Sequence, residues 1–469
     1  MERIVIVGGG YAGFTAAREL EKHLRHELRR GEVELVLVDP RPYMTYQPFL
    51  PEVLAGSVEA RHAAVAHRSH LRRTRLVAGS ATRIDHAHHV VLVRSEHGDE
   101  PGDEPGDEHP LPYDTVVVTA GAVTRVFPVP GVAEHAIGMK HVEEAVAIRD
   151  RLLTSFDRAA SLPAGPERAC LLTATFVGGG FSGVEGFAEL LSFAHDLLRL
   201  YPEIEASELQ LHLVERNPRI LPEVTERPGR WVVDQLERRG AHIHLDSGLE
   251  SAENGVVTLS TGESFASDLL VWTAGNAANP VVATHTDLPV DARGYVVVRP
   301  DLRIGTDDAP VDDAWAAGDG AAVPDLAVPR PGALAVPNAQ HAVRQGRRLA
   351  ANLVAARRGR PTRPYVHGSL GVVATLGLGS GVFEYRRLVV RGRLAWLMHR
   401  GYHVLAIPTW ERKVRVLAVW LTAGVFGRDV VSLASVQQPR AAFAAAAPAA
   451  TVRPTPAATA AEPRQSAEA

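Results

Sequence analysis

Two stretches of this chain have the residue types and spacing to bind a pyrophosphate. Each has G-x-G-x-x-G spacing between a short apolar run and a helical pattern: Gly8, Gly10 and Gly13 in the first, and Gly178, Gly180 and Gly183 in the second. Glycines here let the backbone approach a phosphate, and the free N–H groups of a helix start attract its negative charge. The chemistry indicated is the binding of two dinucleotides.

An acidic residue ends the next apolar run in both stretches. The run VELVLVD ends at Asp39, and LQLHLVE ends at Glu215. A carboxylate at this place accepts hydrogen bonds from ribose hydroxyls. The distance from Gly13 to Asp39 predicts a lengthened first helix. We therefore predict an α/β chain with two Rossmann-like dinucleotide-binding folds, the second inserted in the first.

A third group of polar side chains stands at the start of a predicted helix in VPNAQHAVRQG. Asn338 is a good N-cap, and Gln340 and Arg344 share one helix face because they are four residues apart. An amide and a guanidinium so placed can donate hydrogen bonds to an oxygen that gains negative charge. The alternative is a capped surface helix.

Glu185 is a further candidate for chemistry. It follows Gly183 by two residues, in the first turns of the second predicted nucleotide-binding helix. One interpretation is a favourable charge near a helix N-terminus. The other is a catalytic carboxylate near a redox centre, and both stay open at this point.

Composition excludes several classes of protein. The 469 residues carry a formal net charge of -4, which gives no general attraction to nucleic acid. The single cysteine, Cys170, cannot form an internal disulfide or a cysteine zinc site, and we predict no metal site. No apolar run is long enough to span a bilayer, and MERIVIVGGG begins as a strand, so we expect a cytoplasmic protein with at most peripheral membrane contact.

Three stretches resemble the two-dinucleotide flavoprotein reductases. They are DAWAAGDGAAV with Gly318 and Asp319, YDTVVVTAGA with Gly121, and SDLLVWTAGN with Gly275. In that superfamily the aspartate holds the ribityl chain of the flavin, and the other two strands cross between the folds. The resemblance implies one bound FAD and one exchanging NADH, and no sequence element indicates covalent attachment of the flavin.

Two further stretches narrow the resemblance to type II NADH:quinone oxidoreductase, the single-subunit respiratory NADH dehydrogenase that pumps no protons. They are YMTYQPFLPEVLAG and AQHAVRQG. The family's A-Q-x-A-x-Q helix lines a quinone pocket beside the flavin. Ala339, Gln340 and Ala342 match it, but Arg344 occupies the second glutamine position and Gln345 follows. The resemblance implies that Gln340 donates to a quinone carbonyl, while Arg344 either stabilises the developing charge or pairs with a carboxylate.

The C-terminal region predicts contact with a membrane surface. It combines tryptophans with basic residues and an apolar run: Trp396, Trp410, Trp420, Arg400, Arg412, Lys413, Arg415 and residues 416–426. The alternatives are a dimer interface or a core helix, and the resemblance implies both a homodimer and docking on the cytoplasmic face of the cell membrane. We expect removal of the chain from about Arg393 onward to release the protein from membranes and, provided that the truncated chain folds, to leave flavin reduction by NADH largely intact.

The predicted organisation has five parts. They are residues 1–150, the first segment of the FAD-binding domain with an acidic GDEP loop at 95–110; 151–290, the NADH-binding domain; 291–360, the second FAD-binding segment; 361–436, the membrane-anchoring and dimerisation region; and 437–469, a disordered Ala/Pro-rich tail. The predicted function is NADH oxidation through FAD with reduction of a membrane quinone. The alternatives are a soluble NAD(P)H reductase of ferredoxin or another small acceptor, and a flavin-based redox sensor.

Overall fold

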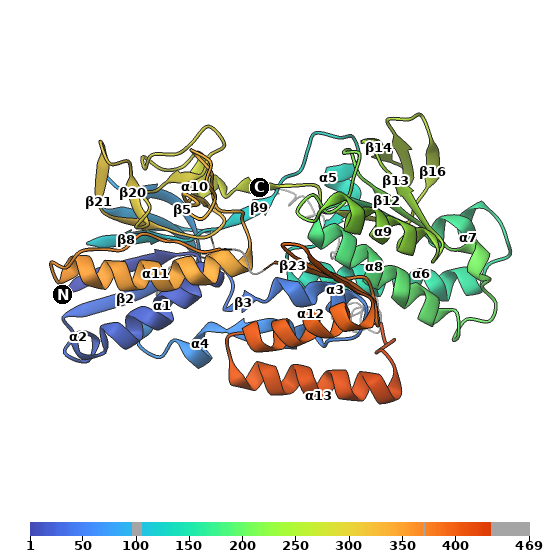
Figure 1. The fold of residues 1–469 in the computed structure, drawn as a ribbon, viewed down its shortest axis with the longest axis horizontal. Helices are drawn as coiled ribbons and strands as arrows, with labels where there is room; N and C mark the ends of the chain where they lie inside the picture. The colour runs from blue at the N-terminus through green and yellow to red at the C-terminus, as the bar shows by residue number, and fades with distance from the viewer. Residues whose placement is uncertain (96–105, 369–370, 433–469) are drawn as a thin grey trace, which may run out of the picture.

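The computed structural model describes residues 1–95, 106–368 and 371–432. Two α/β units lie side by side, and a C-terminal layer of helices lies beneath their junction (Figure 1). The predicted tail at 437–469 and most of the predicted acidic loop lie outside the described residues. Residues 108–110 of that loop instead belong to an edge strand, because the β-hairpin continues past the loop and Arg94 pairs with Glu108 at 2.8 Å.

The first unit is built on a sheet of eight strands in the order β20-β21-β8-β1-β2-β5-β6-β7. The strands are β1 (Glu2–Val7), β2 (Val33–Asp39), β5 (Thr74–Asp85), β6 (Val90–Ser95), β7 (Glu108–Pro112), β8 (Thr115–Val118), β20 (Arg303–Gly305) and β21 (Pro310–Ala316). β1 pairs in parallel with β2 and β8, which explains their continuous apolar runs. β21 pairs in parallel with β8, so one sheet joins segments from the two ends of the nucleotide-binding region.

The second unit is built on a parallel sheet in the order β10-β17-β11-β12-β13. Its strands are β10 (Ala136–Gly138), β11 (Thr173–Val177), β12 (Gln210–Val214), β13 (Ala241–His244) and β17 (Leu269–Trp272), and beside it lies a small sheet of β14 (Leu249–Glu253), β15 (Val256–Leu259) and β16 (Ser264–Ala266). All these strands fall between β8 and β20 in the chain. The predicted α/β class with one Rossmann-like fold inserted in another is confirmed, while the domain limits stay predictions.

A helix follows each glycine turn, and a third helix packs on the first unit. α1 (Tyr11–His23) and α8 (Phe181–Leu197) follow the two turns, and α11 (Ala339–Arg357) packs along α1. Gly346 allows this approach, since a Cβ there would lie 2.5 Å from the Ala12 carbonyl oxygen. The lengthened first helix is in fact two, because it breaks at Leu24 and resumes as α2 (Arg25–Arg29).

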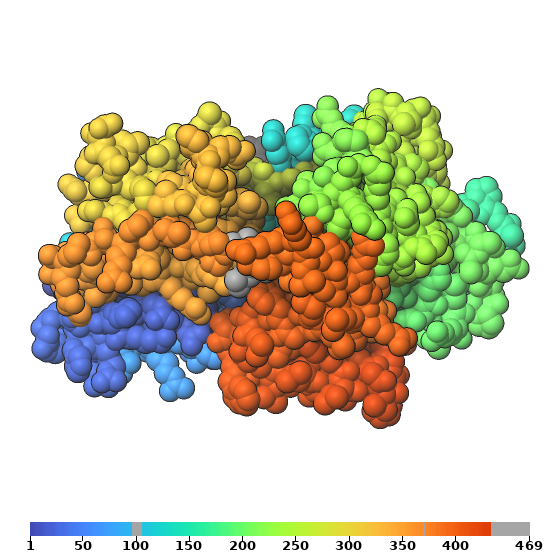
Figure 2. Space-filling model, viewed as in Figure 1, coloured from blue at the N-terminus to red at the C-terminus, as the bar shows by residue number. Residues whose placement is uncertain are grey.

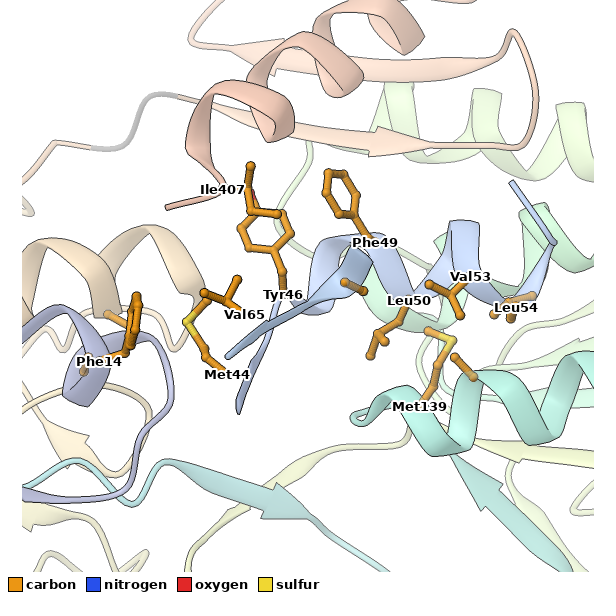
Figure 3. Packing of buried hydrophobic residues seen from close by; sticks show 14 of the residues in the cluster. Phe14, Met44, Tyr46, Phe49, Leu50, Val53, Leu54, Val65, Met139 and Ile407 are labelled. Carbon is orange, nitrogen blue, oxygen red and sulfur yellow. The ribbon is translucent and has the colours of Figure 1, made fainter. Parts of the chain in front are cut away.

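The remaining elements connect these layers. They are β3 (Tyr43–Thr45), α3 (Leu50–Leu54), β4 (Ala64–Ala66), α4 (His67–His70), β9 (Ala122–Thr124), α5 (Val132–His135), α6 (Val142–Ala160), α7 (Pro166–Leu171), α9 (Glu226–Glu237), β18 (Asn276–Ala278), α10 (Pro280–Ala283), β19 (Val296–Val297) and β22 (Ala321–Ala322), with short 3-10 helices at Gln47–Phe49, Ala60–Ala63 and Ala206–Glu208. α3 is central, because it packs against both α6 and α8. Figure 3 shows Leu50 of α3 facing Met139, and Tyr46 pointing toward Ile407 of the C-terminal layer.

The C-terminal layer consists of β23 (Val372–Thr375), β24 (Gly381–Tyr385), β25 (Leu388–Arg391), α12 (Arg393–Ala406) and α13 (Trp410–Phe426). The three strands form an antiparallel sheet, and α12 packs on it. The space-filling view shows α12 and α13 as a block that projects below the junction of the two units (Figure 2). Among the described residues, no helix combines the length and hydrophobicity needed to cross a bilayer.

Candidate functional site

The first glycine turn is closed by direct backbone contact. Gly8 has φ +98°, which favours glycine, and a Cβ on Gly13 would lie 1.9 Å from the Gly8 carbonyl oxygen. The Thr119 hydroxyl at the end of β8 donates to the carbonyls of Val7 at 3.0 Å and Gly8 at 2.8 Å. The turn therefore holds the start of α1 against the carboxyl ends of β1 and β8.

The second glycine turn repeats this arrangement. Gly178 has φ +115°, and a Cβ on Gly183 would lie 1.9 Å from the Gly178 carbonyl oxygen. The Thr273 hydroxyl donates to the carbonyls of Val177 at 2.9 Å and Gly178 at 3.2 Å. The two units thus build the same cradle from the same four positions.

The middle glycine of each motif has a different environment. A Cβ on Gly10 or Gly180 would meet nothing within 4 Å. Their φ angles, -69° and -74°, suit any residue. The folded chain therefore does not need glycine at either place. A ligand that must approach the backbone does need it, and this is the expected role of the second glycine toward a pyrophosphate.

The strand-end acids face the glycine turns. Asp39 accepts from the Gly9 N–H at 2.6 Å, and Glu215 accepts from the Gly179 N–H at 2.6 Å. The other Glu215 oxygen accepts from the Asn217 amide nitrogens at 2.8 and 2.5 Å. Both carboxylates are thereby fixed beside the turns, where a ribose attached to a bound pyrophosphate would lie.

The Gly-Asp turn lies against α1 of the first cradle, where a Cβ on Gly318 would lie 3.1 Å from the Ala12 Cβ. The Gly318 N–H donates to the Gln345 side chain of α11 at 2.8 Å, and Gly318 has φ +83°. Burial raises the pKa of Asp319, and the positive charge of Lys140 opposes this rise. Within the described chain the Asp319 carboxylate has no hydrogen-bond partner. A desolvated acceptor of this kind suits ligand hydroxyls.

The crossover strands meet at the same junction. Gly121 and Gly275, with φ of +69° and +95°, each turn the chain just after a strand. A Cβ on Gly320 would lie 2.8 Å from the Gly121 carbonyl oxygen, so the first crossover touches the Gly-Asp turn. Lys140 donates to the Asn276 side chain at 2.7 Å, and burial lowers the pKa of this lysine.

The α11 helix begins with a polar cluster. Asn338 caps it by accepting from the His341 N–H at 2.8 Å, and Ala339 is the first helical residue. The Gln340 side-chain oxygen lies 2.8 Å from His367 Nε2, and its amide nitrogen lies 3.4 Å from the Tyr402 hydroxyl. If His367 donates, the Gln340 NH2 group points toward Tyr402 on α12.

Arg344 and Glu185 have different surroundings. Arg344 donates to the Gln340 backbone carbonyl at 2.9 Å, and no ion pair of Arg344 occurs in the described part of the chain. The structure therefore does not supply the carboxylate partner that was one expectation for Arg344. Glu185 is buried, accepts from the Thr375 N–H at 2.9 Å and lies 3.2 Å from His399 Nε2.

Sequence reasoning missed the residues that hold the predicted ones in place. Thr119 and Thr273 carried a detectable signal, because both stand in the repeated tripeptide TAG at the end of a buried strand. Tyr402 and His367 carried none, because they approach Gln340 from segments 62 and 27 residues away. Only tertiary packing brings α12 and the segment before β23 to this helix start.

The fold and the site define a protein with two dinucleotide-binding units. The chain belongs to the pyridine nucleotide-disulphide oxidoreductase family, whose model matches residues 2–346. It is 27% identical over 432 residues to a type II NADH:quinone oxidoreductase of Mycobacterium tuberculosis, covering 89% of this chain and 87% of that protein. It is 28% identical over 415 residues to one from Haemophilus influenzae, with 84% and 91% covered. The resemblance expected from the motifs is confirmed.

A solved structure shares the fold over nearly the whole chain. It is the NDH2 of Plasmodium falciparum in complex with NADH, with a TM-score of 0.80 and 16% identity. The similarity covers 92% of this chain and 99% of that one. The C-terminal layer is therefore part of a shared architecture.

The environment of Gly180 generates a direct prediction. We expect Gly180→Val to fold normally, because its Cβ meets no protein atom, and to bind NADH at least about tenfold more weakly, because the side chain fills the pyrophosphate approach. Titration of NADH by calorimetry, with thermal unfolding as the folding control, measures this. Unchanged affinity in a folded variant would contradict the assignment of the second cradle to NADH.

Proposed function

We propose that this protein oxidises NADH through noncovalent FAD and reduces a membrane quinone. One observation carries the proposal. Gln345 of α11 accepts from the Gly318 N–H at 2.8 Å, so the helix that begins with Gln340 packs on the turn that we assign to a flavin. The relatives named NADH dehydrogenase or quinone oxidoreductase across about nine-tenths of the chain support the same reaction.

The residues of the first unit suit FAD. Gly8, Gly10 and Gly13 would receive its pyrophosphate, Asp39 its adenosine ribose, and the desolvated Asp319 its ribityl hydroxyls. When bound, the flavin accepts hydride from NADH and passes two electrons to an acceptor. The second unit would hold NADH, with Glu215 at the ribose.

We assign three residues to the chemistry. The Gln340 amide donates to a quinone carbonyl, and the nearby guanidinium of Arg344 stabilises negative charge that develops there. Glu185, held by Thr375 and His399, serves as a carboxylate beside the redox centre. The N–H groups at the start of α11 add a favourable dipole.

The C-terminal layer supports a peripheral membrane location. An apolar stripe runs along the outer face of α13, and further apolar side chains stand on α12: Trp410, Val414, Leu417, Leu421, Val425 and Phe426, with Leu394, Leu397 and Leu405, each at least 46% exposed. Arg412, Lys413 and Arg415 add positive charge suited to anionic lipid headgroups. We propose docking on the cytoplasmic face of the cell membrane by a homodimer.

Gln340 gives the first test of the function. Acid treatment of the purified protein should release about one FAD per chain, and NADH should then be oxidised steadily only when a soluble quinone is present. We expect Gln340→Leu to slow flavin reoxidation by quinone by roughly 30- to 1000-fold, corresponding to about 2 to 4 kcal/mol, while sparing flavin reduction by NADH.

Stopped-flow measurement of the two half-reactions separates these effects. Arg347→Leu, an exposed position on the same helix, is the matched control and should match the wild type. Equal loss in both half-reactions would mean that Gln340 only supports the flavin. Steady transfer to ferredoxin instead of quinone would favour the soluble reductase, and no turnover with any acceptor would favour the sensor.

Glu215 determines the expected preference for NADH over NADPH. Its carboxylate would repel a 2'-phosphate. Arg219 donates through one guanidinium nitrogen to the carbonyls of Leu221 and Pro222 in its own turn, and Arg216 is exposed next to Glu215. We expect Glu215→Ala to lower kcat/KM for NADH by about tenfold or more, through loss of a charge-assisted hydrogen bond, and to narrow the gap to NADPH. An undiminished preference would exclude this role.

The apolar stripe on α13 gives a test of membrane docking. We expect the double substitution Leu421→Glu and Val425→Glu to weaken binding to anionic liposomes by about a hundredfold or more. Insertion of two aliphatic side chains into the membrane surface contributes roughly 3 kcal/mol to binding. Leu200→Glu, at a leucine that is 57% exposed on the second unit, is the control. Co-sedimentation measures the binding, and equal binding of all three proteins would refute this surface.

A further inference from the structure

Three buried carboxylates lie where the two units meet. Glu52 is on α3, and Glu185 and Glu189 are on α8. Among the described residues, every hydrogen bond or ion pair of their side chains is made by the C-terminal layer or the segment that follows it. The partners are Arg400 and Trp420 for Glu52, Thr375 and His399 for Glu185, and Thr375 and Arg428 for Glu189.

This buried cluster has one negative charge more than positive charge. Three carboxylates face two guanidinium groups, those of Arg400 and Arg428. Asp196 and Arg239 at the edge of the cluster bring one further charge of each sign and leave the excess unchanged. An uncompensated charge in a low-dielectric region is costly, so the cluster is suited to holding one proton.

His399 is the basic group placed to accept that proton. Its side chain is 1% exposed, and its Nε2 lies 3.2 Å from Glu185. Donation from Nε2 to this carboxylate fixes the neutral tautomer, which leaves a lone pair on Nδ1. Nδ1 is buried and has no hydrogen-bond partner within the described residues. The structure thus contains a buried imidazole nitrogen whose lone pair can accept a proton.

A row of packed rings lies between His399 and the start of α11. The His403 ring lies 4.4 Å from that of His399 and 5.0 Å from that of Tyr402, measured between centroids. Tyr402 lies 3.4 Å from the Gln340 amide. His403 Nδ1 also lies 3.0 Å from the Tyr46 hydroxyl, and burial keeps the pKa of His403 well below its usual value. The packing of His403 therefore places His399 on the same side of α12 as the Tyr402 ring that contacts Gln340.

We propose that His399 supplies the proton that quinone reduction consumes. The inference rests on the proposed quinone reduction. NADH supplies two electrons and one proton as hydride, so formation of the quinol consumes one further proton from water. That proton forms an N–H bond at His399 Nδ1. The bond breaks when the second quinone oxygen gains its O–H bond, and His399 returns to the neutral form.

His399→Gln is the sharpest test. Its amide can still donate to Glu185, but it has no basic nitrogen. Enzyme reduced with NADH is mixed with a soluble quinone in H2O and in D2O at a series of pH values. We expect reoxidation to slow by about 100-fold, the lower range for a positioned proton-transfer group, and to lose its pH dependence and solvent isotope effect. Reduction by NADH should stay within about twofold of the wild-type rate.

The controls separate proton transfer from structural damage. His212→Gln removes another buried histidine, in β12 of the second unit, and should leave both half-reactions unchanged. Wild-type reoxidation by His399→Gln overturns the proposal, as does a slower reaction that keeps the wild-type pH profile and isotope effect. If His399→Gln and His399→Asn both fail to retain flavin, the wild-type protein provides the test. Wild-type reoxidation that shows neither pH dependence nor a solvent isotope effect refutes the proposal. Wild-type protein that quinone cannot reoxidise instead refutes the quinone function itself.

Discussion

Compensation of the buried negative charges of three carboxylates is the constraint on which the rest of this structure depends. They belong to Glu52, Glu185 and Glu189. Each carboxylate lies in the apolar region between the two units, and its partners come from Thr375 through Arg428. Removal of those partners would leave buried charges without compensation, at a cost of several kcal/mol each. The C-terminal layer is therefore part of the core, and the condition that a chain ending near Arg393 still folds has these contacts against it.

The same layer connects the two nucleotide-binding units mechanically. Arg400 lies between the rings of Trp396 and Trp420, with its guanidinium carbon 4.3 and 4.6 Å from their centroids, and it binds Glu52 of the first unit. Arg428 binds Glu189 of the second unit. Because α3 and α8 also pack against each other, one segment fixes the angle between the two cradles and so the place where the two dinucleotides would meet.

α12 has two faces of opposite character. One side carries His399 and His403, which are buried against Glu185 and Tyr46. The other side leaves Leu394 and other apolar residues exposed beside the stripe on α13. A single helix thus separates a polar, titratable interior from a surface suited to lipid.

The sequence by itself determined the two nucleotide-binding folds, because glycine spacing, apolar strands and strand-end acids act locally. Asp39 and Glu215 each reach the turn beside their own strand. It also indicated Asn338 as a helix cap and Gln340 as a site residue. It could not determine what surrounds Gln340 or Glu185, since Tyr402, His367 and His399 come from distant segments. Only tertiary packing decides those contacts, because burial of charge depends on which surfaces meet and leaves no local pattern in the chain.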